Sequence, residues 1–361
     1  MSVVFESGTY GYHTFRIPAL ARTRYGTLLA FAEGRRDGSG DSGDIDILVC
    51  RSADGGETWS EPMLVLSHGT DTAGNPCVVV DPGSGDVVLL STRNGGGVSE
   101  KEILRGTVSW QDSRRIYLQR SCDDGISWTE ANQITDSVKQ PSWRWYATGP
   151  GHGIALRHGS FPGRLVVPAN HSVPGLAPGS YGAHLLLSDD GGFGWRIGAV
   201  DGGTRGWINP NESTVAELDS GEVLVNTRNQ HGRNPATRVQ AISQDSGETF
   251  SDPFSPRPDL HAPVVQGSML SIGGRLFFAS PADPNRRASM SIRASKDGRS
   301  WWPVHRVSEL PAGYSDLVPL GGTIDSDTGF VNGADGIGLL YETGESNPYE
   351  RLEFTAIHGM L

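Results

Sequence analysis

The chain has 361 residues, of which 49 are glycine, 22 are proline and only 20% are charged. This composition is typical of a globular protein rich in turns, and it argues against a helical or a disordered protein. The net charge of −11 argues against nucleic acid as a partner, because phosphate backbones attract basic surfaces. No apolar run approaches the roughly 18 residues of a membrane-spanning helix, so we expect no membrane span.

The three cysteines, Cys50, Cys77 and Cys122, are too widely spaced to predict a disulfide framework or a zinc site. We expect three small buried side chains, and no feature predicts a metal or another cofactor. The first residues lack the basic segment and apolar run of a signal peptide. We therefore expect either an intracellular protein or a secreted one whose leader has been removed. The oligomeric state stays open, and a monomer is compatible with the sequence.

A short motif recurs along the chain, and it predicts a tight turn at each copy. The motif is Ser-x-Asp-x-Gly-x-x-aromatic in four copies and one residue shorter in a fifth. Aspartate accepts hydrogen bonds from nearby backbone N–H groups and glycine adopts positive φ, so each copy fits a hairpin between two strands. The copies are SADGGETW (52–59), SCDDGISW (121–128), SDDGGFGW (188–195), SQDSGETF (243–250) and SKDGRSW (295–301).

The spacing of the motif predicts the fold. Successive copies begin 69, 67, 55 and 52 residues apart, which suits four-stranded propeller blades with their loops. Five marked blades and one unmarked blade, built from the two chain ends, would close a ring of six. We therefore predict an all-β protein, a six-bladed β-propeller of four-stranded antiparallel blades, with residues 1–361 forming one domain.

Several charged residues are not explained by the turn motif. Arg16 lies between Phe15 and Ile17 in what otherwise reads as a buried strand, where an unpaired charge would cost several kcal/mol. Taken singly, each such residue fits a surface or structural role. A propeller would bring distant ones together, because the inner ends of its blades converge on one axis. The others are Glu33, Arg35, Arg36, Asp37, Asp41, Asp44 and Asp46 around a glycine-rich loop, then Glu212, Arg228, Arg287, Tyr314 and Glu342 near predicted strand ends.

In this order, the motifs FRIPAL, AFAEGR, the Asp repeats, NES…VAEL…NTRN, YSDL and LLYE resemble the exo-α-sialidases (neuraminidases) of the bacterial and animal type. The resemblance runs from about residue 4 to residue 342. It implies a six-bladed propeller and a glycoside hydrolase that releases terminal sialic acid with retention of configuration. It also implies that the partner is a sialylated glycan, carried by a sialoglycoprotein, a ganglioside or an oligosaccharide, and that no cofactor is needed.

The resemblance assigns roles in substrate binding to six residues. Arg16, Arg228 and Arg287 match the family's arginine triad, which grips the sugar carboxylate because guanidinium groups fork onto carboxylates. Arg287 is preferred to Arg286 and Arg293 because it precedes ASMSIR. The remaining three are Glu342, which matches the glutamate that holds Arg16, Arg35, which matches an arginine near the C4 substituent, and Glu100, a further candidate contact.

Three more residues match the family's catalytic groups. Tyr314 matches the tyrosine nucleophile, which avoids the repulsion that a carboxylate would meet at a carbon already bearing one. Glu212 matches the glutamate that takes the phenolic proton. The general acid/base is expected on the loop after AEGR, where we choose Asp41, with Asp44 as the competing candidate.

Two departures from the family and three alternative functions stay open at this stage. The segment 321–336 is longer than usual and is expected to reshape a rim. The segment NHS (170–172) stands where some relatives have aromatic residues facing the glycerol side chain. The alternatives are a trans-sialidase, a hydrolase of a related 2-keto acid sugar, and a non-catalytic glycan-binding propeller. The sequence predicts neither the linkage preference nor whether the sugar is N-acetylated, N-glycolylated or deaminated.

Overall fold

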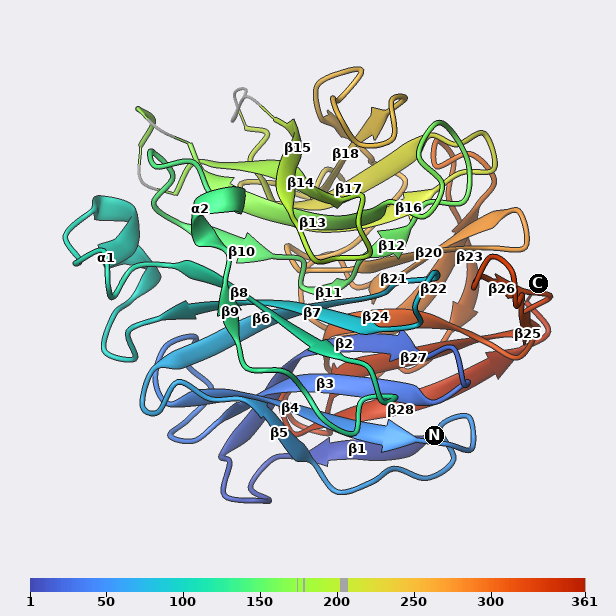
Figure 1. Ribbon diagram of the computed structural model, residues 1–361, viewed down its shortest axis with the longest axis horizontal. Coiled ribbons are helices and arrows are strands. Elements are labelled where there is room, and N and C mark those ends of the chain that lie inside the picture. Colours follow the sequence, from blue (N-terminus) through green and yellow to red (C-terminus); the bar gives the residue numbers. More distant parts are fainter. Residues whose placement is uncertain (174, 178, 202–206, 361) are drawn as a thin grey trace.

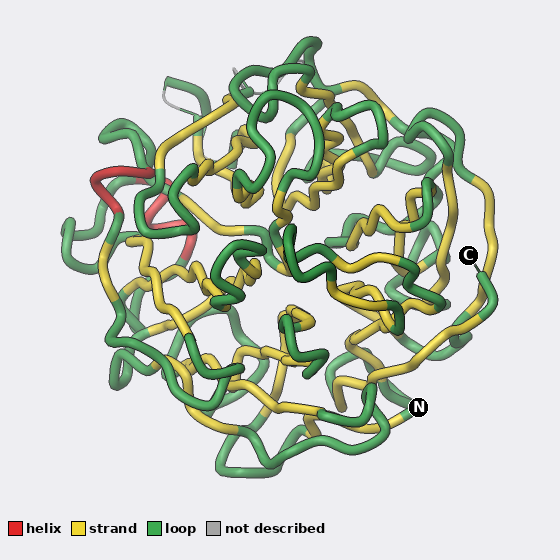
Figure 2. The backbone as a smooth tube through the Cα atoms, turned by 45° about the vertical axis from the view of Figure 1, so that its right-hand side comes forward, coloured by secondary structure: helices red, strands yellow, loops and turns green. Residues whose placement is uncertain are grey.

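The computed structural model describes residues 1–173, 175–177, 179–201 and 207–360. These residues form strands and two short helices, α1 (Glu100–Arg105) and α2 (Thr135–Val138), and no helix among them is long and apolar enough to cross a membrane. The strands radiate around one axis, as the ribbon and the backbone tube show (Figure 1; Figure 2). The predicted all-β propeller is therefore confirmed.

The described strands group into six antiparallel blades, numbered here along the chain. The first two blades share one sheet through a parallel pair between Ile45 and Thr72. Blade one holds β2 (Thr14–Arg22), β3 (Leu28–Arg35), β4 (Ile45–Ser52) and β5 (Met63–Leu66), and blade two holds β6 (Thr72–Val80), β7 (Val87–Asn94), β8 (Arg115–Ser121) and β9 (Asn132–Gln133). Blade three holds β10 (Tyr146–Thr148), β12 (Ile154–Ala155), β13 (Leu165–Ser172), β14 (Tyr181–Ser188) and β15 (Arg196–Val200), and β11 (Gly151–His152) pairs with β6.

The last three blades complete the ring. Blade four holds β16 (Pro210–Glu217), β17 (Val223–Asn229), β18 (Arg238–Ser243) and β19 (Ser255–Pro256), and blade five holds β20 (Ser268–Ile272), β21 (Arg275–Pro281), β22 (Met290–Ser295) and β23 (Trp302–Arg306). Blade six holds β24 (Ala312–Leu320), β27 (Gly336–Thr343), β28 (Arg351–His358) and β1 (Ser2–Glu6). The N-terminal strand thus closes the ring against the C-terminal strand, as the unmarked sixth blade predicted.

The repeated turn motif joins the third and fourth strands of blades one to five. In the first copy, Ser52 Oγ accepts the Gly56 N–H at 2.9 Å, and Asp54 Oδ1 accepts the Thr58 N–H at 3.0 Å. Gly56 has a φ of 93°, and a Cβ there would collide with the ring of Phe354 in blade six. The motif therefore shapes both the turn and the contact with the preceding blade.

Apolar residues of adjoining blades pack together into the core. One cluster joins Phe15 and Leu48 of blade one to Leu340 and Phe354 of blade six, with Trp59 of the first turn motif against it. Cys50 and Cys77 are buried in such clusters, as expected. The expectation was wrong for Cys122, which is exposed because it lies on the second turn motif.

The innermost strands place different residue types at the two ends of the axis. On β24, Tyr314 lies near the start and Val318 near the end, and on β2 Arg16 and Leu20 are separated in the same way. At about 3.3 Å per residue, the two residues of each pair lie some 13 Å apart along their strand. The charged residues singled out by the sequence lie at the starting end, which is described next.

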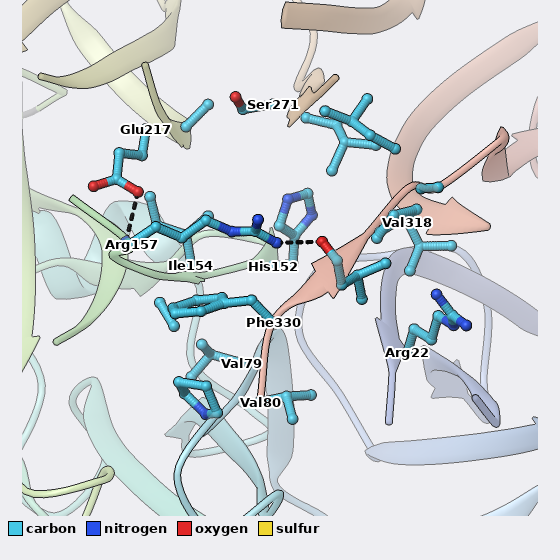
Figure 3. Close-up of a pocket in the computed structure, with 18 of the residues that line it drawn as sticks. Arg22, Val79, Val80, His152, Ile154, Arg157, Glu217, Ser271, Val318 and Phe330 are labelled. Atoms are coloured by element: carbon cyan, nitrogen blue, oxygen red, sulfur yellow. Dashed lines mark hydrogen bonds between the residues drawn. The ribbon is translucent and has the colours of Figure 1, made fainter. Parts of the chain in front are cut away.

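The other end of the axis holds a cavity of about 490 Å³, whose lining mixes apolar strand residues with charged side chains such as Arg22 and Glu217. The hairpin of β25 (Thr323–Ile324) and β26 (Val331–Asn332), from the long segment 321–336, borders it. The segment therefore reshapes the rim of this cavity, far from Tyr314. Figure 3 shows Arg157 reaching across the cavity above Phe330, and its guanidinium lies 4.6 Å from that ring.

Candidate active site

Arg16 and Glu342 form a buried ion pair at the starting end of the axis. Arg16 Nε donates to Glu342 Oε1 at 3.1 Å and Nη2 to Oε2 at 3.4 Å. Glu342 is fully buried and also accepts the backbone N–H groups of Ile17 at 3.0 Å and Tyr314 at 2.9 Å. One carboxylate therefore offsets the buried charge of Arg16 and ties together the strands β2 and β24.

The backbone of β2 is distorted next to Arg16. Ile17 has a φ of 60°, and the pairing of β2 with β3 shifts register between Arg16 and Ala19. A β-branched residue is strained in this left-handed region, and such bulges re-aim the neighbouring side chain. Ile17 packs against Val265 and Tyr314, so the strain is held by contacts at the site itself.

Arg35 connects the loop after β3 to this ion pair. Its Nη2 donates to Glu33 at 2.6 Å, and its Nη1 donates to Asp41 Oδ1 at 2.8 Å and to the carbonyl of Ser39 at 2.6 Å. Arg16 Nη1 also contacts Asp41 Oδ1, at 3.3 Å. Two guanidinium groups therefore converge on the Asp41 carboxylate, whose side chain is 79% exposed.

The two candidate acids of this loop have different surroundings. Desolvation by the surrounding loop acts to raise the pKa of Asp41, but the guanidinium groups of Arg35 and Arg16 hold it below its ordinary value. Asp44 instead pairs with Arg36 Nε at 3.3 Å. The structure thus brings Asp41, and not Asp44, against Arg16 and Arg35.

Tyr314, Glu212 and Arg228 form a hydrogen-bonded group across two blades. The Tyr314 hydroxyl donates to Glu212 Oε1, while Arg228 Nη1 donates to Glu212 Oε2 at 2.9 Å and to the tyrosine oxygen at 3.1 Å. Burial and the Glu212 carboxylate raise the pKa of Tyr314, against the opposite effect of the nearby arginines. The phenol is therefore protonated at neutral pH and has an acceptor in place for its proton.

The three candidates for the third arginine of the triad also differ in their contacts. The guanidinium carbon of Arg287 lies 5.5 Å from the ring centre of Tyr314. Arg286 is exposed and pairs with Asp283, and the buried Arg293 donates to Ser280 Oγ at 3.1 Å. Of the three, Arg287 alone contacts Tyr314 in the described interactions.

Tyr349 is a residue that sequence reasoning missed. Its hydroxyl accepts a hydrogen bond from Arg287 Nη1 at 2.8 Å, and its ring centre lies 4.3 Å from the guanidinium carbon of Arg16. It therefore bridges two of the three arginines. In the sequence, Tyr349 is only an aromatic residue in the loop before β28. Such residues are common in loops and do not by themselves indicate a site.

Glu100 lies at the start of α1, and its nearest partner was also missed. The hydroxyl of Tyr181 donates to Glu100 Oε1. Burial raises the pKa of Glu100, and the charges of Glu212 and Asp41 act in the same direction, whereas Arg114 acts against them. Glu100 is thus within electrostatic reach of the predicted catalytic residues.

Arg114, immediately before β8, is a further charged residue that sequence reasoning missed. It is 4% exposed, donates through Nη1 to Asn75 and Thr92, and stacks on Trp145 with its guanidinium carbon 4.0 Å from the ring centre. Burial lowers its pKa to about 10, so it stays charged at neutral pH. In the sequence, it looked like one of two arginines leading into a strand.

The segment NHS lies inside blade three. His171 is buried and stacks on Trp143 with ring centres 3.9 Å apart, and its Nδ1 lies 3.0 Å from Nδ1 of His184. Burial lowers the pKa of His171 to about 3. The described contacts of His171 are therefore structural, with other core rings.

Comparison with known proteins identifies the family. Residues 26–325 match the BNR repeat-like domain family. The chain is 32% identical over 308 residues to the exo-alpha-sialidase of Aspergillus fumigatus, covering 80% of this chain and 69% of that protein. The chain belongs to the sialidase family.

Other sialidases match over most of the chain. The sialidase of Bacteroides fragilis is 29% identical over 363 residues, which cover 94% of this chain and 62% of that protein. The chain therefore spans less than two thirds of the length of this relative. The solved structure of the Hadza microbial sialidase Hz136 superposes with a TM-score of 0.82 at 27% identity, covering 99% of this chain and 68% of that one.

Proposed function

We propose that this sialidase-family chain is an exo-α-sialidase that hydrolyses terminal sialic acid from glycoconjugates, with retention and through a tyrosyl intermediate. The observation that carries the proposal is Tyr314, whose hydroxyl is hydrogen-bonded to Glu212 and Arg228 and whose ring is flanked by Arg16 and Arg287. A phenol between a carboxylate and three guanidinium groups suits attack on a carbon that itself bears a carboxylate.

The arginine triad would bind the sugar carboxylate. Arg16 and Arg228 are already oriented by Glu342 and Glu212, so little side-chain entropy is lost when the substrate binds. In the described residues, Arg228 and Arg287 each use only Nη1 in hydrogen bonds to protein side chains. The Nη2 group of each has no hydrogen bond to a described residue and can donate to the carboxylate.

Attack and departure each need one proton transfer. The Tyr314 oxygen forms a bond to the anomeric carbon while its proton passes to Glu212. The glycosidic bond breaks as its oxygen takes a proton from Asp41. The raised pKa of Tyr314 means that the free phenolate is avoided, and its proton leaves only as the new bond forms.

Hydrolysis of the intermediate reverses these transfers. Asp41 takes a proton from water, whose oxygen attacks the anomeric carbon on the side that the aglycone left. The bond to Tyr314 breaks, and Glu212 returns the proton to the phenolic oxygen. Two displacements at one carbon retain its configuration.

Asp41 must be protonated before it can act as an acid, although Arg16 and Arg35 hold its pKa low in the free protein. A bound sugar carboxylate would neutralise Arg16, and the sugar would cover the exposed side chain of Asp41. Both changes raise the pKa of Asp41. We therefore infer that substrate binding itself prepares the acid.

Product analysis tests this proposal. The protein is mixed with an α-linked sialoside, and the first-formed sugar is followed by proton NMR before it mutarotates. We expect free sialic acid in the α form. The β form as first product, a transferred or anhydro sugar as the main product, or no turnover by the folded protein would contradict the proposal.

A further inference from the structure

We propose that the cavity at the end of the axis opposite Tyr314 is a second binding site, and that its ligand is a medium-chain fatty acid. The alkyl chain would lie along the axis between the inner strands, and the carboxylate would bind Arg22 and Arg157. None of the residues assigned to catalysis takes part, so the two proposals are independent. The volume of about 490 Å³ lies within the range usual for small-molecule sites.

The cavity is formed where the innermost strands of the blades surround the axis. Its lining comes from the far ends of β2, β6, β16, β20 and β24, and from β11 and β12. On β20 the lining extends from Met269 to Ile272, a run of about 10 Å at the usual rise of a strand. An extended chain can therefore enter along the axis.

Aliphatic side chains of this lining are left partly exposed. Val80, Ile154, Ile272 and Pro319 are not fully buried, although all four lie on inner strands of the ring. An alkyl chain would cover this apolar surface. Each methylene group that it buries should strengthen binding about fourfold.

Arg22 and Arg157 supply the cationic groups. In the part of the chain that the structure describes, neither forms an ion pair with a carboxylate. Arg22 Nη1 donates to the carbonyl of Gly321 at 2.5 Å, and Arg157 Nη2 donates to that of Val331 at 2.6 Å. No described hydrogen bond uses Nε or Nη2 of Arg22, or Nε of Arg157. Both side chains, which Figure 3 shows beside the cavity, therefore hold the hairpin and keep donors for a carboxylate.

The carboxylates of the lining are already supplied with donors or lie in water. Both oxygens of Glu217 accept backbone N–H groups, at 2.7 Å and 2.9 Å. Asp81 Oδ2 accepts the N–H of Ser84 at 2.8 Å and its hydroxyl at 2.7 Å. Asp219 is exposed on the turn after β16. The arginines are thus the charged groups of the lining whose hydrogen-bonding capacity is left over.

The surroundings of the two arginines favour an added negative charge. Burial lowers the pKa of Arg22, and the opposite effect of Asp335 does not offset it. Burial also lowers the pKa of Arg157, against the opposite effects of Glu217 and Asp219. A bound anion would stabilise both guanidinium groups in their charged form.

These features together select an amphipathic anion. A small anion such as acetate would leave the aliphatic wall in contact with water. An alkyl cation would cover the wall but would be repelled by the arginines. A fatty acid satisfies both parts of the cavity, because its chain is apolar and its head is a carboxylate.

Isothermal titration calorimetry of the parent protein tests the nature of the ligand. Three probes are compared below their micelle concentrations, namely decanoate, octanoate and decyltrimethylammonium. We expect decanoate to bind with one ligand per chain, and octanoate to bind about tenfold more weakly because its chain is shorter by two methylene groups. Decyltrimethylammonium should bind at least about tenfold more weakly than decanoate, because it cannot accept from the arginines.

Variants locate the site. Arg22→Gln and Arg157→Gln should each weaken decanoate binding by about tenfold or more, since each removes a hydrogen bond between charged groups. The matched control is Arg275→Gln at the turn between β20 and β21, because that exposed side chain donates to the carbonyl of Met360 and does not line the cavity. It should leave the dissociation constant unchanged. Arg287→Gln should also leave it unchanged, because its side chain lies at the charged end.

Three results would overturn the inference. They are failure of decanoate to bind the folded parent protein, equal affinities for the three probes, and an affinity for decanoate that Arg22→Gln and Arg157→Gln leave unchanged. Binding that Arg287→Gln abolishes would place the fatty acid on the arginine triad, and it would overturn the inference as well. The proposed sialidase function would stand in each case, because it depends on residues at the other end.

Discussion

The two ends of the propeller axis are built from the same inner strands and hold different groups of side chains. At one end Arg16, Glu342, Tyr314 and Glu212 form a network of buried charges. At the other end the continuations of those strands line a cavity of about 490 Å³, bordered by the β25–β26 hairpin, where aliphatic residues alternate with charged side chains such as Arg22 and Arg157. This cavity therefore lies away from the reactive groups.

The strand directions explain this division. First strands begin, second strands end and third strands begin at the charged end, where Arg16, Arg228 and Tyr181 are found. The repeated turns join third to fourth strands and so lie at the other end. The repeated turns therefore lie at one end of the axis. The loops at the charged end do not carry the turn motif, and their sequences differ from blade to blade.

The largest expected effect comes from the nucleophile. Tyr314→Phe should lower kcat on a sialoside by on the order of 10³-fold or more, because the covalent step is lost. The control is Tyr341→Phe in the same blade, whose hydroxyl contacts Glu353 away from the site, and it should keep parental activity. Steady-state kinetics check both, and similar losses in the two variants would contradict the role of the Tyr314 hydroxyl as the nucleophile.

The buried ion pair should dominate the stability of the charged end. Glu342→Ala removes the buried partner of Arg16, which keeps only the exposed Asp41, and leaves two backbone N–H groups without an acceptor, so we expect a loss of about 3–5 kcal/mol. Glu309→Ala removes a pair with Arg306 whose side chains are both exposed, and should cost less than about 1 kcal/mol. Denaturant midpoints measure both, and equal losses would show that Glu342 is not the anchor of this end.

Acid should weaken the fold through the buried histidines of blade three. Burial lowers the pKa of His171 to about 3 and that of His184 well below its ordinary value. The unfolded chain therefore binds protons that the folded chain excludes, and stability is lost as pH falls below about 6.5. For His171 this amounts to about 2 kcal/mol at pH 5 relative to pH 7.

A substitution isolates the contribution of His171 to the pH dependence of stability. In His171→Asn, the change in unfolding free energy between pH 7 and pH 5 should shrink by about 2 kcal/mol. The exposed His305→Asn should leave that change as it is in the parent. If His171→Asn left the pH dependence of stability unaltered, burial would not be keeping His171 unprotonated in the folded protein.

The smallest effect is expected at the end that holds the cavity. Phe330→Ala removes the ring under Arg157, at a cost of about 1 kcal/mol in stability. Sialoside hydrolysis should stay at the parental rate, because the hairpin is far from Tyr314. A large loss of activity with a small loss of stability would show that the two ends are coupled.

The sequence was most informative where a pattern repeats. The turn motif predicted five blades, and the absence of a sixth copy correctly assigned the last blade to the chain ends, where β1 pairs with β28. A buried arginine in a strand also predicted a buried partner, and Glu342 fills that position. These inferences depend on local chemistry and on the cost of burying charge.

The rest of the site could not be predicted because its neighbours come from different blades. Arg114, Tyr181 and Tyr349 are ordinary strand-end and loop residues in the sequence, and each is important only through contacts across the ring. The choice between Asp41 and Asp44 likewise depended on how the loop folds over Arg35.

The central claim is that Tyr314 forms the covalent intermediate. The most direct test is to incubate the protein with a 2,3-difluoro derivative of sialic acid, whose C3 fluorine slows hydrolysis of the glycosyl-enzyme after fluoride leaves C2. Digestion and mass spectrometry then locate the adduct. We predict an adduct on the peptide containing Tyr314 and none in Tyr314→Phe. An adduct on Glu212, Asp41 or another residue, or active protein that never becomes labelled, would contradict the account.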